Sequence, residues 1–142
     1  MSIDANKELA RRFVEEIWGR ADIELANTLI APDCIDHNPG PGLTPDRAGH
    51  NQLLMQVHTA FPDAHFTTDD LIAEGDKVVD RWTMEATHSG PFGPLPPTGR
   101  RIRMTGMDIL RIENGQIVEV WHLEDTLGLM QQLGAVPVPT TA

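Results

Sequence analysis

The feature that most constrains the fold of this chain is a change in hydrophobic period near Pro62. Before that residue, apolar side chains recur at the spacing of amphipathic helices, and after it they alternate as in half-buried strands. Helices followed by an antiparallel sheet indicate the α+β class. No internal repeat or linker interrupts the sequence, so we expect a single domain over residues 1–135 and a loosely held tail over residues 136–142.

The predicted elements follow from this pattern and from the residues that break it. Helices are expected around residues 9–17, from about 22 to 30, from about 45 to 60 and around 127–133. Strands are expected over residues 64–73, 77–88, 101–112 and 116–123, with a further short strand at 34–37. Turns at 74–76 and 113–115 join neighbouring strands, and a loop rich in proline and glycine covers residues 90–99.

Charge and composition exclude several kinds of partner. The 142 residues include 11 Lys and Arg against 21 Asp and Glu, a formal net charge of −10. Phosphates are bound by clustered cations, so we expect neither nucleic acid nor an anionic membrane surface as a partner. A single cysteine, Cys34, allows no internal disulfide and no Cys-based zinc site. With no secretory signal and no apolar run of about 18 residues evident, we expect a cytoplasmic protein. Its length is sufficient for a core that encloses a pocket.

The strand predicted over residues 101–112 carries the first sign of chemistry. Its even positions are apolar apart from Asp108, which stands in the middle of the face expected to be buried. A buried carboxylate without a partner is costly, so we expect a partner on the next strand, where His122 is the candidate. The two side chains form either an acid–base pair or, in the alternative interpretation, a structural ion pair that fixes the strand register.

Two registers of the last hairpin decide whether Asp108 and His122 share a face. A two-residue turn places Asp108 opposite Trp121 and turns His122 to the other face. A three-residue turn over residues 113–115 places Asp108 opposite Val120, with His122 one diagonal step away on the same face. We prefer the second register, because it leaves one face apolar apart from Asp108 and His122.

Several short motifs, taken as a set, resemble the SnoaL-like polyketide cyclases and cover nearly the whole chain. They are Pro32-Asp33-Cys34-Ile35-Asp36-His37-Asn38-Pro39, Thr87-His88-Ser89-Gly90, Pro96-Pro97-Thr98-Gly99-Arg100-Arg101, Arg111-Ile112-Glu113-Asn114-Gly115-Gln116-Ile117-Val118-Glu119 and Leu127-Gly128-Leu129-Met130-Gln131-Gln132-Leu133-Gly134. The resemblance implies the cone-shaped α+β barrel of the nuclear transport factor 2-like superfamily, in which N-terminal helices wrap a curved antiparallel or mixed sheet around a pocket. It also implies a homodimer or higher homo-oligomer, since that sheet often packs through its outer face.

The resemblance also implies an activity. The best-known members of the family close a polyketide ring by intramolecular aldol condensation, without cofactor or metal. The family pattern has a His at the position of Asp108 and an Asp at the position of His122, so the two residue types are exchanged in this chain. A family Gln position matches Gly106, and a polar family position matches Asp36. Asp108 and His122 are thus implied to be catalytic, while the identity of the base stays open.

The remaining candidates are residues that we expect to bind the substrate. They are His50 and Leu53 on the third predicted helix, Trp82 and Met104 on apolar strand faces, and Asp36 and His37 on the segment that edges the pocket by resemblance. The alternative is core packing for the apolar members and for His50, and turn chemistry for His37. His122-Leu123-Glu124 fits the start of a metal-binding facial triad, but a third ligand is not evident, so we expect neither metal nor cofactor.

These observations predict a cofactor-independent acid–base enzyme with a small hydrophobic, polyketide-like carbonyl substrate, which it cyclises in an intramolecular aldol-type reaction. One alternative is an epoxide or lactone hydrolase, or an isomerase, on the same fold. Another is a non-catalytic module whose pocket binds a small apolar molecule without changing it. The sequence leaves these three open.

Overall fold

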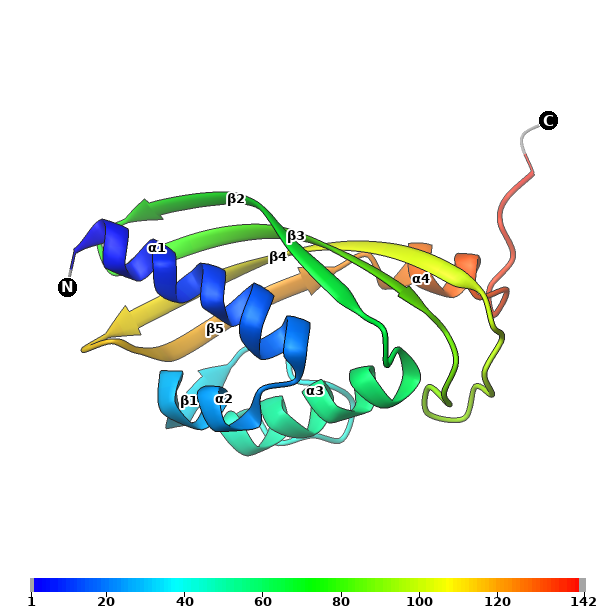
Figure 1. Cartoon of the computed structure of the whole chain (residues 1–142), viewed down its shortest axis with the longest axis horizontal. Coiled ribbons are helices and arrows are strands. Elements are labelled where there is room, and N and C mark those ends of the chain that lie inside the picture. Colours follow the sequence, from blue (N-terminus) through cyan, green and yellow to red (C-terminus); the bar gives the residue numbers. More distant parts are fainter. Residues whose placement is uncertain (1, 141–142) are drawn as a thin grey trace.

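The computed structural model of the protein describes residues 2–140 (Figure 1). Its elements are, in order, α1 (Ile3–Arg12), the π-helical segment η1 (Phe13–Trp18), α2 (Ile23–Leu29), β1 (Ile30–Asp36), α3 (Arg47–Ala60), β2 (His65–Glu74), β3 (Lys77–Thr87), β4 (Arg101–Glu113), β5 (Gln116–Glu124) and α4 (Thr126–Gln132). The predicted α+β order, with helices before the long strands, is confirmed. Of the predicted tail, residues 137–140 are exposed and residues 141–142 lie outside the described residues.

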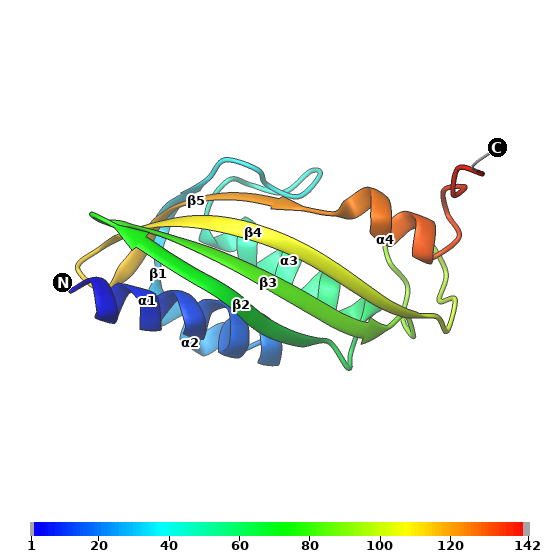
Figure 2. The same cartoon turned by 90° about the horizontal axis from the view of Figure 1, so that it is seen from above.

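The five strands form one mixed sheet in the order β1-β5-β4-β3-β2. Strands β2 to β5 run antiparallel to their neighbours, whereas β1 pairs with β5 in parallel. The sheet is strongly curved but does not close into a barrel (Figures 1 and 2). Pro32 lies inside β1, where it is tolerated because β1 is an edge strand.

Helices α1, α2 and α3 cover the concave side of the sheet, and each has an N-terminal capping side chain. Ser2, Asp22 and Asp46 cap α1, α2 and α3 by accepting a hydrogen bond from a backbone N–H of the first turn. Helix α1 lies along β2 and β3, while α2 and α3 lie below the sheet (Figures 1 and 2). No helix in residues 2–140 is long and apolar enough to cross a membrane.

The main core lies between this concave face and the helices. The buried side chains alternate along the strands, as the even positions of β4 illustrate: Ile102, Gly106, Asp108, Leu110 and Ile112 are buried. The core therefore uses the face that the sequence predicted, and it carries Asp108 into the interior.

The last hairpin has a different turn from the three-residue turn preferred above. Glu113 pairs with Gln116, so the turn is a two-residue one at Asn114-Gly115, with positive φ angles of 50° and 74°. Both angles suit the primed turns that match strand twist, which favours Asn-Gly over the three-residue alternative. The preferred three-residue turn was therefore wrong.

A β-bulge nevertheless brings Asp108 and His122 onto one face. Strand β5 carries one extra residue, Val118, between its pairs with Ile112 and Arg111. The extra residue reverses the alternation of β5 beyond it. As a result Asp108 lies directly opposite His122, instead of opposite Trp121 or Val120. The shared face was predicted correctly, although for the wrong reason.

Candidate active site

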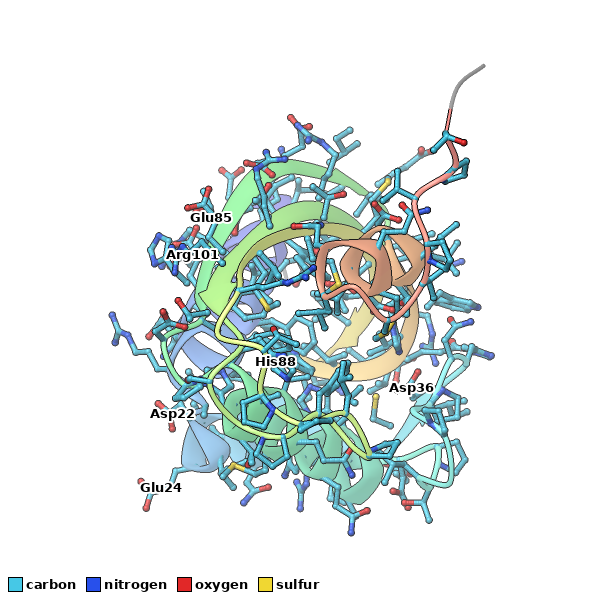
Figure 3. All side chains as sticks on the ribbon, turned by 90° about the vertical axis from the view of Figure 1, so that its right-hand side faces the viewer. Asp22, Glu24, Asp36, Glu85, His88 and Arg101 are labelled. Carbon is cyan, nitrogen blue, oxygen red and sulfur yellow. The ribbon has the colours of Figure 1, made fainter. Side chains whose placement is uncertain are left out.

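A cavity of about 420 Å³ lies between the concave face of the sheet and the helices. Seven of the eight predicted site residues line it: Asp36, His50, Leu53, Trp82, Met104, Asp108 and His122. Figure 3 looks along the sheet, whose strands form an arc around the side chains of the interior, with Asp36 at one side. Most of the other lining residues are apolar, among them Phe13, Trp18, Val57, Phe66, Met84 and Phe92. An apolar cavity of this size with a few polar groups is typical of a small-molecule site.

His122 is the centre of the polar wall of the cavity, which is formed by Asp36, Asp108, His122 and Glu124. Its Nε2 lies 3.0 Å from Asp36 Oδ1, and its Nδ1 is hydrogen-bonded to Glu124 Oε1. A carboxylate only accepts, so both ring nitrogens donate and the ring is an imidazolium. Burial disfavours that charge, but the bonds to Asp36 and Glu124 outweigh burial and raise the pKa of His122 to about 10.

Asp36 reaches His122 through the parallel pairing of β1 with β5. The two residues are 86 positions apart in the chain, and Asp36 pairs in register with Val120. Burial disfavours its ionised form, yet the hydrogen bonds from His122 and from the Asn38 backbone N–H hold the pKa of Asp36 below its usual range. Asn38 Oδ1 in turn accepts from the His122 backbone N–H at 2.9 Å, which fastens the loop after β1 to β5.

Asp108 lies on the cavity side of a second carboxyl group. Its register partner on β3 is Asp80, which is completely buried behind it. Burial raises the pKa of Asp80 to about 7. Burial and then the neighbouring charge of Asp80 raise the pKa of Asp108 well above its usual range, and the His122 imidazolium only partly offsets this.

His50 lines the cavity from α3 as a neutral ring. Its Nε2 accepts from Trp18 Nε1–H at 3.1 Å, so its proton is on Nδ1, which lies 3.0 Å from Asn51 Oδ1. Burial lowers the pKa of His50, which keeps the ring uncharged. The structure therefore places one charged histidine and one neutral histidine at the same cavity.

Gly106, which the resemblance matches to a Gln position, leaves space that a neighbouring side chain fills. A Cβ atom on Gly106 would lie 2.2 Å from the Trp82 indole, which packs over this residue from β3. Trp82 is itself buried and lines the cavity. The missing side chain at position 106 is thus matched by a large aromatic wall next to Asp108.

His37 is the predicted site residue that the structure does not bring to the cavity. It follows Asp36 along the chain and points to the opposite face of the sheet, because side chains alternate along an extended segment. Its ring stacks on Trp121 with centroids 4.6 Å apart, and Nε2 lies 2.6 Å from Glu119 Oε2. His37 therefore belongs to a partly exposed cluster on the outer face, together with Arg111 and Glu119, which are joined at 2.7 Å.

Two polar residues of the site were missed by the sequence reasoning. Asp80 shares the even positions of β3 with Trp82 and Met84, so the same alternation that singled out Asp108 also marks Asp80 as buried. Glu124 was considered only as part of a metal motif, although residues two apart on a strand share a face, which places Glu124 beside His122. Both residues therefore had a readable signal, whereas the bulge at Val118 decides which face of the sheet His122 and Glu124 occupy.

The polar wall also has the spacing that a metal ion would need. Ligand atoms of Asp108, His122 and Glu124 lie within 4.8 Å of one another. However, both ring nitrogens of His122 already donate to carboxylates, and a metal needs an unprotonated nitrogen. The hydrogen bonds of the wall therefore favour a proton network over a metal centre.

Comparison with known proteins identifies the family of this chain. The family model for the SnoaL-like polyketide cyclase matches residues 8–133. Aklanonic acid methyl ester cyclase DnrD of Streptomyces peucetius is 28% identical over 138 residues, or 94% of this chain and 92% of that protein. The structure of TsrD from Streptomyces laurentii aligns with a TM-score of 0.85 at 29% identity, covering 96% of this chain and 99% of that one. IdmH from Streptomyces antibioticus aligns at 0.79 and 33% identity, covering 94% and 99%.

Proposed function

This chain belongs to the SnoaL-like polyketide cyclase family, and we propose that it is an acid–base enzyme that closes a ring in a hydrophobic carbonyl compound by an intramolecular aldol-type reaction. The observation that carries the proposal is the polar wall of the cavity, where Asp108 and the His122 imidazolium lie side by side among apolar residues. Such a pair offers a proton acceptor next to a positive charge, which enolate chemistry needs.

The hydrogen bonds of His122 support an assignment of roles. A histidine that donates from both ring nitrogens has no free lone pair, so His122 does not serve as the base. Asp108 reaches the cavity, and its raised pKa makes its carboxylate a stronger base than an exposed Asp. In the proposal Asp108 is the base, and His122 stabilises the negative charge that develops on the substrate oxygen.

The proposed reaction conserves protons and electrons. Asp108 takes a proton from a carbon that lies between carbonyl groups, and the C–H electron pair becomes an enolate beside His122. The enolate carbon then forms a C–C bond with a second carbonyl carbon of the same molecule, whose C=O π electrons move to oxygen. The resulting alkoxide takes back the proton held by Asp108. Each step is a proton transfer or a bond rearrangement within the substrate.

The charge of the cavity supports a neutral substrate. Asp36, Glu124 and Asp108 are acidic, His122 supplies the positive charge, and no Lys or Arg is found among the described lining residues. A free carboxylate on the substrate would meet a net negative wall at low dielectric, which is unfavourable. In the proposal the enzyme therefore prefers an ester or another uncharged form over the corresponding acid.

The direct test is turnover with aklanonic acid methyl ester, the compound in the name of the DnrD relative. Asp108→Asn is expected to lower kcat by about 10²–10⁴-fold, because it removes the base while keeping the shape. Glu85→Gln, which neutralises an exposed carboxylate on β3, is the matched control and should turn over like the wild type. Equal turnover by the wild type and Asp108→Asn would refute the role of Asp108.

The same assay separates the two alternatives. Incorporation of labelled oxygen from water into the product would indicate a hydrolase instead of a cyclase. Binding of the ester without conversion, seen by native mass spectrometry, would indicate a binding module. Comparing the ester with its free acid tests the inference about charge, since the acid is expected to have the higher KM.

A further inference from the structure

Asp80 is a buried acid for which the proposed reaction gives no role. It lies on β3 directly opposite Asp108, outside the set of residues that line the cavity, and its exposed fraction is 0%. Neither of its carboxylate oxygens accepts a hydrogen bond from any residue that the structure describes. A buried acid without a donor is rare in a folded protein and calls for an explanation.

Asp108, the register partner of Asp80, explains this buried acid only if one of the two carboxyl groups holds a proton. Side chains of directly opposed residues in an antiparallel pair have Cβ atoms about 4.5–5.5 Å apart, so the two carboxyl groups are neighbours. Ionised carboxylates only accept hydrogen bonds and repel one another, so two of them cannot bond. One added proton turns one acid into a donor and removes the repulsion.

The surroundings act on the two acids in opposite ways. Asp108 faces the His122 imidazolium and Glu124 on β5, and His122 bridges onward to Asp36 on β1. Among the described residues, Asp108 is the titratable group that acts on Asp80, whose other register neighbour is Leu71 on β2. The His122 cation favours a charge on Asp108, whereas burial and the Asp80 carboxylate disfavour it, so the two carboxyl groups compete for one proton.

We propose that Asp80 and Asp108 share one proton through the neutral pH range, and that Asp80 is a positioning residue which holds Asp108 through this shared proton. The shared hydrogen bond keeps the second oxygen of Asp108 directed toward the cavity. When Asp108 accepts a substrate proton, the pair becomes neutral inside an apolar environment, which lowers the cost of the transfer. This catalytic consequence rests on the proposed function, whereas the shared proton does not.

The test of the shared proton needs no substrate. Urea unfolding of the full chain is measured from about pH 5 to about pH 8, above the usual pKa of an unfolded Asp, for wild type, Asp80→Asn and Asp80→Leu. A native state that binds one extra proton loses about tenfold in its folding equilibrium constant per pH unit. Both variants are expected to lose one such tenfold dependence. Asp33→Asn, which neutralises an exposed carboxylate on β1, should keep the slope of the wild type.

Each result is decisive for one of the two claims. Parallel pH profiles for wild type and both Asp80 variants would overturn the shared proton, and so would carboxyl ¹³C resonances showing both acids ionised at pH 6 in the wild type. If the variants do not fold, the ¹³C titration alone decides the question. If the slope changes but neither wild type nor variant turns over the ester, the proposed function fails and the shared proton stands. If the wild type does turn over the ester, Asp80→Asn should move the acid limb of the pH profile of kcat to lower pH.

Discussion

Two histidines of this protein meet acidic side chains on opposite faces of the same sheet. His122 lies inside, with 12% of its side chain exposed, between Asp36 and Glu124. His37 lies outside, with 37% exposed, against Glu119 and the Trp121 ring. Both have a carboxylate within hydrogen-bond distance, so the residue types alone do not separate them. Burial does, because charges removed from water interact strongly, whereas exposed pairs are screened.

The largest expected effect comes from removing the inner histidine. His122→Gln takes away the cation that compensates the buried Asp36 and the half-buried Glu124, which leaves both carboxylates uncompensated. We expect a loss of about 3–5 kcal/mol in the free energy of unfolding, measured in urea at pH 7. Turnover of the methyl ester should fall by at least about 10²-fold. A variant as stable and as active as the wild type would remove the distinction between the two histidines.

A smaller effect is expected from pH alone. The pKa of His122 is raised from its ordinary value of 6.5 to about 10 in the folded protein. The folded state therefore holds this proton more tightly, so its stabilisation is complete below pH 6.5 and is lost as the pH rises toward 10. We expect a decrease of about 4 kcal/mol between pH 6.5 and 10 in the wild type. In His122→Gln only a small decrease should remain from pH 8 to 10, from groups such as the Cys34 thiol, whose pKa burial raises to about 12. A decrease as large as that of the wild type would assign the effect to another group.

The smallest effect is expected from the outer histidine. His37→Gln removes a stacked ring and an exposed ion pair while leaving the cavity unchanged. We expect the Tm to shift by less than about 2 °C and kcat to stay at the wild-type value. Thermal unfolding and turnover, measured side by side with His122→Gln, sharpen the comparison. A large loss of turnover would show that the outer cluster communicates with the cavity.

Much of the fold could be predicted from local pattern, because alternation and helix caps are local signals. The buried face of β4 was found in this way. Asp80 lies in the same alternation on β3, so its burial had an equally local signal. The contact of Asp36 with His122 could not be predicted, since it depends on a parallel pairing between residues 86 positions apart. His37 was predicted at the pocket together with Asp36, but neighbouring residues of an extended segment point to opposite faces.

The extra residue at Val118 has a consequence for how such a site can change. The alternation of β5 on the far side of the bulge depends on whether the number of residues between the turn and His122 is odd or even. A single-codon insertion or deletion between the bulge and His122 would exchange the inner and outer sets of side chains and carry Trp121 to the cavity. A change of one residue in the length of β5 at this point would therefore alter which side chains face the cavity, while the codons of the catalytic residues stay unchanged.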